Sequence, residues 1–164
     1  MPIVISNASP IINLAIIGRL NLLKSFWGKI YIPEAVWEEV VIDGEDNTEV
    51  IEIKNADWLI VEKVNDGNIV NLLMQNLDKG EAEAIALAIE KNADIILLDE
   101  TDARETADLY KIEKTGVLGI LLLAKLKNEI PNLQQEIEKL KSRANFWLKD
   151  SLIQTVLKEA GEIS

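Results

Sequence analysis

The sequence predicts a single α/β domain, a three-layer α/β/α sandwich with a mainly parallel sheet covered by helices on both faces. Short apolar runs that are typical of buried strands alternate along the chain with longer segments of helical periodicity. Such alternation is typical of parallel sheets. The length of 164 residues fits one domain with a sizeable core, and 48% hydrophobic and 27% charged residues is the balance of a globular protein.

The first part of the chain carries clear start and stop signals. Residues 3–6 form an apolar run and predict the first strand. Ser9 and Pro10 predict a helix start, with Ser9 as the N-cap and Pro10 at the first helical position, and Gly18 predicts the end of that helix. The next predicted elements are a short helix at 19–26, a strand at 29–32 that ends at Pro33, a helix at 34–41 and a polar loop at 43–47.

The rest of the chain continues the alternation of strands and helices. Helical spacing is strongest at 81–91, where apolar residues share one side of the predicted helix. The other predicted elements are helices at 49–55, 69–74, 101–110, 117–127, 133–141 and 150–160, and strands at 58–64, 94–98 and 111–114. The alternation stops after Asn128. We therefore expect one domain over residues 1–164, with a core of about 1–130 and a helical appendage at about 131–164.

The composition excludes several classes of chemistry. The chain has no cysteine and no histidine, so it has no disulfide, no thiolate or imidazole metal ligand and no Ser-His-Asp triad. The net charge of −11 argues against a nonspecific polyanion binder and suits a basic protein partner. It does not exclude a nuclease, because bound divalent ions would offset carboxylates. A basic rim could form from one stretch of cations, although solvated helix faces are the simpler reading: Arg104, Lys111, Lys114, Lys125 and Lys127.

The chain carries no pattern of a membrane protein. Its amino terminus has no basic stretch ahead of an apolar run, so it does not read as a signal peptide. The longest apolar run, 117–124, is much shorter than the roughly 20 residues that a transmembrane helix needs. We therefore expect a cytoplasmic protein with no membrane partner.

Acidic residues lie where an α/β fold would bring them together. Asp99 closes the apolar run 95–98, and Asn7 closes the run 3–6. Polar residues at the carboxyl ends of parallel strands face the crevice where open α/β sheets bind ligands. Glu39 and Glu81 lie on predicted helices, and Asp102 follows Asp99 closely. Because clustered carboxylates repel one another unless a hard cation neutralises them, the pattern predicts a metal site.

Each of these residues also has an ordinary structural reading. Glu81 could simply favour a helix start, where a carboxylate interacts well with the helix dipole. Asp99 and Asp102 could cap the helix at 101–110. One of Glu38 and Glu39 is expected to be solvated. The four tryptophans are scattered at element ends and favour core or interface positions over base stacking: Trp27, Trp37, Trp58 and Trp147.

Taken together, the ordered motifs resemble a known family. The motifs are SNASP at 6–10, IPEAVWEEV at 32–40, GEAEAIALA at 80–88, IILLD at 95–99 and GVLG at 116–119 followed by LLAK at 122–125. Their order and spacing, over roughly residues 3–131, resemble the PIN domain. The resemblance is strongest to small prokaryotic PIN proteins that are described as predicted nucleic-acid-binding proteins.

The resemblance implies a fold and a chemistry. PIN domains adopt a Rossmann-like α/β/α sandwich, hold one or two Mg²⁺ or Mn²⁺ ions on acidic residues, and hydrolyse single-stranded RNA. Many are toxins of VapBC toxin–antitoxin pairs, and small ones commonly form homodimers. The resemblance therefore implies single-stranded RNA and an antitoxin protein as partners. It implies metal ligands and catalytic acids at Glu39, Glu81, Asp99 and Asp102, a further metal ligand at Asn7, and substrate contacts at Ser9 and Arg104.

Asn7 departs from the family pattern, because it falls where the family usually has its first aspartate. An amide oxygen can still bind Mg²⁺, but it brings no negative charge and cannot act as a base. The first reading is a working metal-dependent endoribonuclease that uses the remaining acids. The second is a weak or inert PIN module that binds RNA or a partner protein. The third is a subfamily with a shifted ligand set. A nucleotide-binding domain is disfavoured because the chain has no Gly-rich phosphate loop.

Overall fold

A five-stranded parallel sheet forms the centre of the computed structural model, which describes residues 1–44 and 47–164. The strands lie in the order β3-β2-β1-β4-β5, and every neighbouring pair is parallel. Their bounds are β1 Val4–Ser6, β2 Ile30–Pro33, β3 Leu59–Glu62, β4 Ile95–Leu97 and β5 Lys114–Thr115. The expected α/β class and parallel sheet are confirmed. Positions 45–46 of the predicted polar loop lie outside the described residues.

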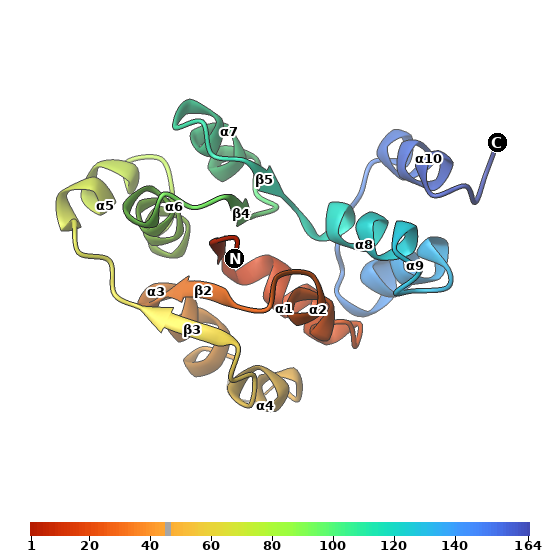
Figure 1. Ribbon diagram of the computed structural model, residues 1–164, viewed down its shortest axis with the longest axis horizontal. Coiled ribbons are helices and arrows are strands. Elements are labelled where there is room, and N and C mark those ends of the chain that lie inside the picture. The colour runs from red at the N-terminus through yellow and green to blue at the C-terminus, as the bar shows by residue number, and fades with distance from the viewer. Residues whose placement is uncertain (45–46) are drawn as a thin grey trace.

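Two hydrophobic clusters cover the two faces of the sheet. In β1, successive side chains point to opposite faces, so Val4 belongs to one cluster and Ile5 to the other. The cluster around Ile5 is closed by α5 Gly67–Leu73, α6 Lys79–Lys91 and α7 Thr101–Leu109. The cluster around Val4 is closed by α1 Ala8–Ile16, α2 Asn21–Trp27, α4 Glu49–Lys54, α8 Val117–Leu126, α9 Leu133–Arg143 and α10 Asp150–Glu159. Figure 1 shows α5 and α10 at opposite ends of the long axis.

The helix predicted at 34–41 is present but changes its winding. It begins as α3 Glu34–Trp37 and continues as a π-helical segment, η1 Glu38–Ile42. Its start is fixed to α6, because the Glu83 carboxylate on α6 accepts a hydrogen bond from the Ala35 backbone N–H at 3.1 Å. Wide π turns are rare and recur at functional sites. Here the wide turn carries Glu39.

Two predicted boundaries are wrong for local reasons. The first helix starts at Ala8 with Asn7 as its N-cap residue, so Ser9 is not the N-cap. The Ser9 hydroxyl instead donates a hydrogen bond to Asp99 Oδ2 at 3.3 Å. The last strand begins only at Lys114, because Lys111 adopts a left-handed backbone (φ 58°) and turns the chain after α7. Gly18 (φ 75°) ends the first helical segment as predicted.

The C-terminal helices pack into the cluster around Val4. Leu133, Ile137 and Leu140 of α9 and Ile153 and Val156 of α10 are buried there. Division of the chain into a core up to about residue 130 and an appendage remains a prediction. Within residues 1–44 and 47–164, no helix has the length and apolar character that crossing a bilayer requires.

The tryptophans do not share one environment. Trp58 is buried, and Trp27 and Trp37 pack partly buried against the cluster around Val4, as expected for core residues. Trp147 differs, because 77% of its surface is exposed. Trp147 is therefore not a core residue, and the alternative of an interface position stays a prediction for this side chain, which follows the end of α9 in the segment that leads to α10.

Candidate functional site

The carboxyl ends of β1 and β4 bring Asn7 and Asp99 together. Ser6 pairs with Leu97 in the parallel ladder, and the Asn7 backbone N–H donates to the Leu97 carbonyl at 2.9 Å. Each candidate residue directly or nearly follows its strand, so both reach the same edge of the sheet. This is the edge at which open α/β sheets bind ligands.

The Asn7 side chain is buried, and only one of its two polar atoms has a hydrogen-bond partner within the described residues. It is 3% exposed, and its amide Nδ2 donates to Glu100 Oε2 at 3.1 Å. Its carbonyl oxygen, Oδ1, has no hydrogen-bond partner within the described residues. A buried carbonyl without a partner costs free energy, on the order of 1–3 kcal/mol. Asn7 Oδ1 therefore marks a position where a cation or a donor would be stabilised.

Gly80 on α6 leaves room beside that oxygen. A Cβ added at Gly80 would lie 2.8 Å from Glu39 Oε1 and 3.6 Å from Asn7 Oδ1. The first of these distances is shorter than real Cβ contacts, so a side chain at Gly80 would displace the Glu39 carboxylate. Glycine here allows the Glu39 and Asn7 oxygens to lie around one point of the α6 backbone.

The pKa of the Glu39 carboxyl is raised by its surroundings. Much of the residue reaches solvent, but its carboxylate lies against α6, and burial of that group raises its pKa to about 7. Repulsion from Asp78, Glu100 and Glu81 adds to the rise in pKa. No cation is among the causes that shift this carboxyl. A bound divalent ion would lower the pKa and favour the charged form.

Asp99 is held by the backbone of α8 and by α1. Its Oδ1 accepts from the Val117 N–H at 2.9 Å, and its Oδ2 accepts from the Ser9 hydroxyl at 3.3 Å. Burial raises its pKa to about 6 despite the opposing effect of the Val117 hydrogen bond, and Glu100 raises it further. A Cβ at Gly116 would collide with Asp99 Oδ1, so glycine is required for this approach. Arg104 lowers the pKa of Asp99 without offsetting the effect of burial, so Asp99 is fixed in place with its charge only partly compensated.

Glu81 is part of a capping box as well as of the acidic edge. The Glu81 N–H donates to Asp78 Oδ1 at 2.8 Å, and the Asp78 N–H donates back to Glu81 Oε1 at 3.0 Å. Glu81 is 8% exposed, and burial raises its pKa. Glu81 therefore does stabilise the start of α6, as one of its two sequence interpretations expected. One of its carboxylate oxygens is used there, by the Asp78 N–H.

Sequence reasoning missed Glu100. Its carboxylate accepts from the Asn7 amide and, at 3.3 Å, from the Asp99 N–H, and it raises the pKa of Glu39, Glu81 and Asp99. One signal could have found it. A buried amide at the end of a strand needs an acceptor, and Glu100 is the acid next to the neighbouring strand end.

The remaining candidates lie at the margin. Asp102 is exposed in the first turn of α7, and its charge raises the pKa of Glu81. Ser9 bridges Asp99 to the Asn13 amide, which donates to the Ser9 hydroxyl at 3.1 Å. Arg104 Nη1 donates to the Leu98 carbonyl at 2.9 Å. Glu100 is the acid that the candidates share, because its charge raises the pKa of Glu39, Glu81 and Asp99, whereas Asp102 is among the acids that raise the pKa of Glu81.

The donor chemistry of this edge fits Mg²⁺ or Mn²⁺. Its groups are carboxylate and amide oxygens, which hard divalent cations prefer, and one of them is buried without a partner. Within the described residues, no three acidic side chains form a preformed cage. An ion held here would keep several water ligands, as Mg²⁺ commonly does.

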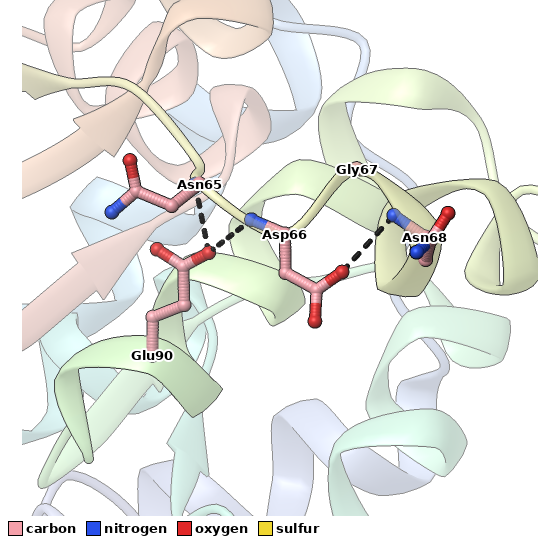
Figure 2. Close-up of a pocket in the computed structure, with 5 residues that line it drawn as sticks. All are labelled: Asn65, Asp66, Gly67, Asn68 and Glu90. Atoms are coloured by element: carbon pink, nitrogen blue, oxygen red, sulfur yellow. Dashed lines mark hydrogen bonds between the residues drawn. The ribbon is translucent and has the colours of Figure 1, made fainter.

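A second hollow in the molecule shows acids with a different role. In Figure 2, Glu90 on α6 faces the loop that precedes α5, and its Oε1 accepts from the Asn65 and Asp66 N–H groups at 2.8 and 2.7 Å. Asp66 Oδ1 accepts from the Asn68 and Ile69 N–H groups at 3.1 and 3.2 Å. These carboxylates bind the loop's own backbone. The hollow is therefore explained by local structure and needs no ligand.

Comparison with known families gives one match over nearly the whole chain. The family model described as PIN domain matches residues 3–162. No match was found among curated proteins.

Proposed function

Because the chain belongs to the PIN domain family, whose members are generally nucleases, we propose that it is a Mg²⁺- or Mn²⁺-dependent endoribonuclease that hydrolyses single-stranded RNA. The observation that carries the proposal is the buried, unpartnered Asn7 Oδ1 beside carboxylates whose pKa values are raised. An uncompensated acidic edge of this kind is costly to the folded state unless a cation binds there.

The proposed ion would be held by Asn7, Glu39, Asp99 and Glu100, with Glu81 and Asp102 contributing negative charge. A bound divalent ion supplies acidity to its water ligands and stabilises charge on an attacked phosphate. The chain's own residues fix the donors. Ser9 and the Val117 N–H hold the Asp99 carboxylate, and Gly80 leaves space for Glu39.

Glu100 lies next to Asn7 and brings a negative charge that the asparagine does not have. The Asn7 amide donates to Glu100, so the carboxylate that the family usually places at the first strand lies here one hydrogen bond away. We propose that Glu100 supplies the charge that Asn7 lacks, which is the shifted ligand set considered from the sequence. The amide oxygen and the neighbouring carboxylate together replace one aspartate.

The second candidate function is a PIN module that binds RNA or a partner protein with little or no catalysis. Two observations favour it. Asn7 brings no charge to the first strand, and the described acids form no preformed cage of three. A toxin role, an antitoxin partner and a homodimer remain predictions of the family resemblance.

Cleavage of labelled single-stranded RNA in Mg²⁺, Mn²⁺ or EDTA separates the two functions. We expect the native chain to cut RNA only with a divalent ion and Asp99→Asn to abolish cutting. If the native chain is silent and Asn7→Asp gains activity, the binding module becomes the function. Silence of all three proteins in both metals would contradict the nuclease.

A further inference from the structure

A groove with mixed chemistry begins at Asp99 and runs away from the acidic edge. It has a volume of about 550 Å³ and is lined by α7, β5, the start of α8, the segment 146–149 that follows α9, and α10. Cavities of roughly 300–1,000 Å³ are typical of ligand sites. Beside Asp99, the residues that matter most are the cations Arg104, Lys114 and Lys149 and the aromatic residues Phe146 and Trp147.

Trp147 lies on an anchored segment but turns its indole to solvent. α9 ends where Asn145 adopts a left-handed backbone (φ 52°), and the Phe146 N–H donates to the Leu140 carbonyl at 3.0 Å. Phe146 and Leu148 on either side are partly buried against the core, whereas Trp147 is 77% exposed. A large aromatic ring that is held outward by buried neighbours is a suitable platform for base stacking.

The cations of the groove are notable in a chain with a net charge of −11. Arg104 uses one N–H for the Leu98 carbonyl, and a guanidinium has five donors in all. Lys114 pairs with the exposed Asp108 of α7, and Lys149 is exposed at the start of α10. Phosphate oxygens are the partners that suit such donors next to an aromatic ring.

We propose that this groove binds a nucleotide of single-stranded RNA beside Asp99, with its base stacked on Trp147 and its phosphates facing Arg104, Lys114 and Lys149. The choice of RNA rests on the proposed nuclease function. The groove would lead the strand from the α9–α10 segment to the acidic edge. The C-terminal helices then contribute to substrate binding as well as to the core.

Binding without cleavage tests the groove by itself. The probe is a fluorescein-labelled 2′-O-methyl uridine octamer in EDTA, followed by fluorescence anisotropy. We expect Trp147→Ala to raise the Kd about tenfold and Trp147→Phe to restore most of the affinity, because a phenyl ring still stacks. We expect Lys149→Ala to raise the Kd and to reduce the slope of log Kd against log salt by about 0.7, whereas Trp147→Ala leaves that slope unchanged.

Matched controls lie on other surfaces. Leu72→Ala removes an exposed apolar side chain on α5 and Lys24→Ala removes an exposed cation on α2, so both should bind the octamer like the native chain. An unchanged Kd for Trp147→Ala would overturn the proposal. So would a Trp147→Ala variant that changes from dimer to monomer in sedimentation velocity with unchanged RNA affinity, because this face would then be a contact between copies.

The binding assay and the cleavage assay together separate this proposal from the proposed nuclease function. If the chain binds the octamer through Trp147 but never cuts RNA, the RNA-binding groove is supported and the nuclease function is contradicted. If the chain cuts RNA with a divalent metal but the Trp147 and Lys149 variants bind the octamer like the native chain, the nuclease function is supported and the RNA-binding groove is contradicted.

Discussion

Two regions of the molecule bury carboxylates, and they balance the charge in opposite ways. On α9, Glu136 is 1% exposed and accepts from Arg19 Nε at 2.8 Å and from Lys139 Nζ at 3.1 Å. Burial alone would raise its pKa, but these two cations hold the pKa of Glu136 below its ordinary value. At the acidic edge, burial raises the pKa of Glu39 and Asp99 to about 7 and about 6, and neighbouring acids add to both shifts.

The difference separates a structural acid from a candidate functional one. Glu136 has its counter-charges inside the fold and fastens α9 to the turn after α1. At the edge around Asn7, Arg104 lowers the pKa of Asp99 but its hydrogen bond goes to the Leu98 carbonyl, no cation is among the causes that shift the pKa of Glu39, and one buried oxygen has no partner within the described residues. Buried charge that is not paired is costly, so an uncompensated cluster at a ligand-binding edge favours an external cation.

The largest expected effect is on catalysis at the uncompensated edge. Asp99→Asn keeps the shape of the side chain and removes its charge, so RNA cleavage should fall by about 100-fold or more, the scale of losing one important electrostatic contact. The free energy of unfolding, measured in urea without metal, should stay the same or rise, because repulsion from Glu100 is relieved. A large loss of stability in this variant would mean that Asp99 is structural, like Glu136.

The compensated region should respond in the reverse sense. Glu136→Gln removes the charge that Arg19 and Lys139 share, and we expect it to lower the free energy of unfolding by about 2 kcal/mol, the scale of hydrogen bonds to charged groups. Metal-dependent RNA cleavage by the folded variant should remain near the native rate. A variant as stable as the native chain would show that the comparison between the two regions is wrong.

A smaller effect is expected at the Asn7–Glu100 pair. Glu100→Gln should weaken Mn²⁺ binding about tenfold if Glu100 supplies the missing charge, a typical cost of removing a group that supports a metal site. Asn7→Asp in the same variant should restore most of the affinity, and isothermal titration calorimetry measures both. Equal affinity in native and Glu100→Gln chains would leave Glu100 only the structural role of accepting from the Asn7 amide and the Asp99 N–H.

The remaining effect concerns pH and the stability of the metal-free protein. A carboxyl group whose pKa is raised on folding binds a proton more tightly in the native state, so stability falls as pH rises from its unfolded pKa of about 4 through its folded pKa. For Asp99 and Glu39 the folded values are about 6 and about 7. We therefore expect the free energy of unfolding in EDTA to decrease between pH 4.5 and 7.5 by about 2 kcal/mol from Asp99, with a smaller addition from the partly exposed Glu39.

Two comparisons check the origin of that pH dependence. The decrease should be smaller in the double variant Glu39→Gln, Asp99→Asn, and excess Mg²⁺ at pH 7.5 should reverse much of it. Glu136 works in the opposite direction, because its pKa is lowered and its contribution is lost only as pH falls below its ordinary range. Stability that rises from pH 4.5 to 7.5 in EDTA would contradict the picture of the edge.

Much of the fold could be predicted because hydrophobic periodicity carries it. The buried strands 4–6 and 95–97 and the helix 79–91 follow directly from apolar spacing. The π-helical turn at η1 and the late start of β5 could not be predicted in this way. They depend on packing of α3 against α6 and on a left-handed residue, and neither leaves a periodic signal.

The candidate site was only partly predictable for the same reason. Strand-end positions indicate Asn7 and Asp99, because topology alone brings them to one edge. Glu100 and the exposed Trp147 depend on where individual side chains point. Glu100 could have been found only by asking which acid accepts from a buried Asn7 amide, and the outward turn of the Trp147 indole is a property of tertiary packing that residue type does not show.

The most direct test of the acidic edge as a metal centre is titration of Mn²⁺ into the metal-free native chain by calorimetry at pH 7.5, with Asp99→Asn and Glu136→Gln beside it. We predict saturable binding to the native chain and to Glu136→Gln, and affinity lower by about tenfold or more in Asp99→Asn. The absence of saturable binding to the native chain, or equal binding by Asp99→Asn, would contradict it.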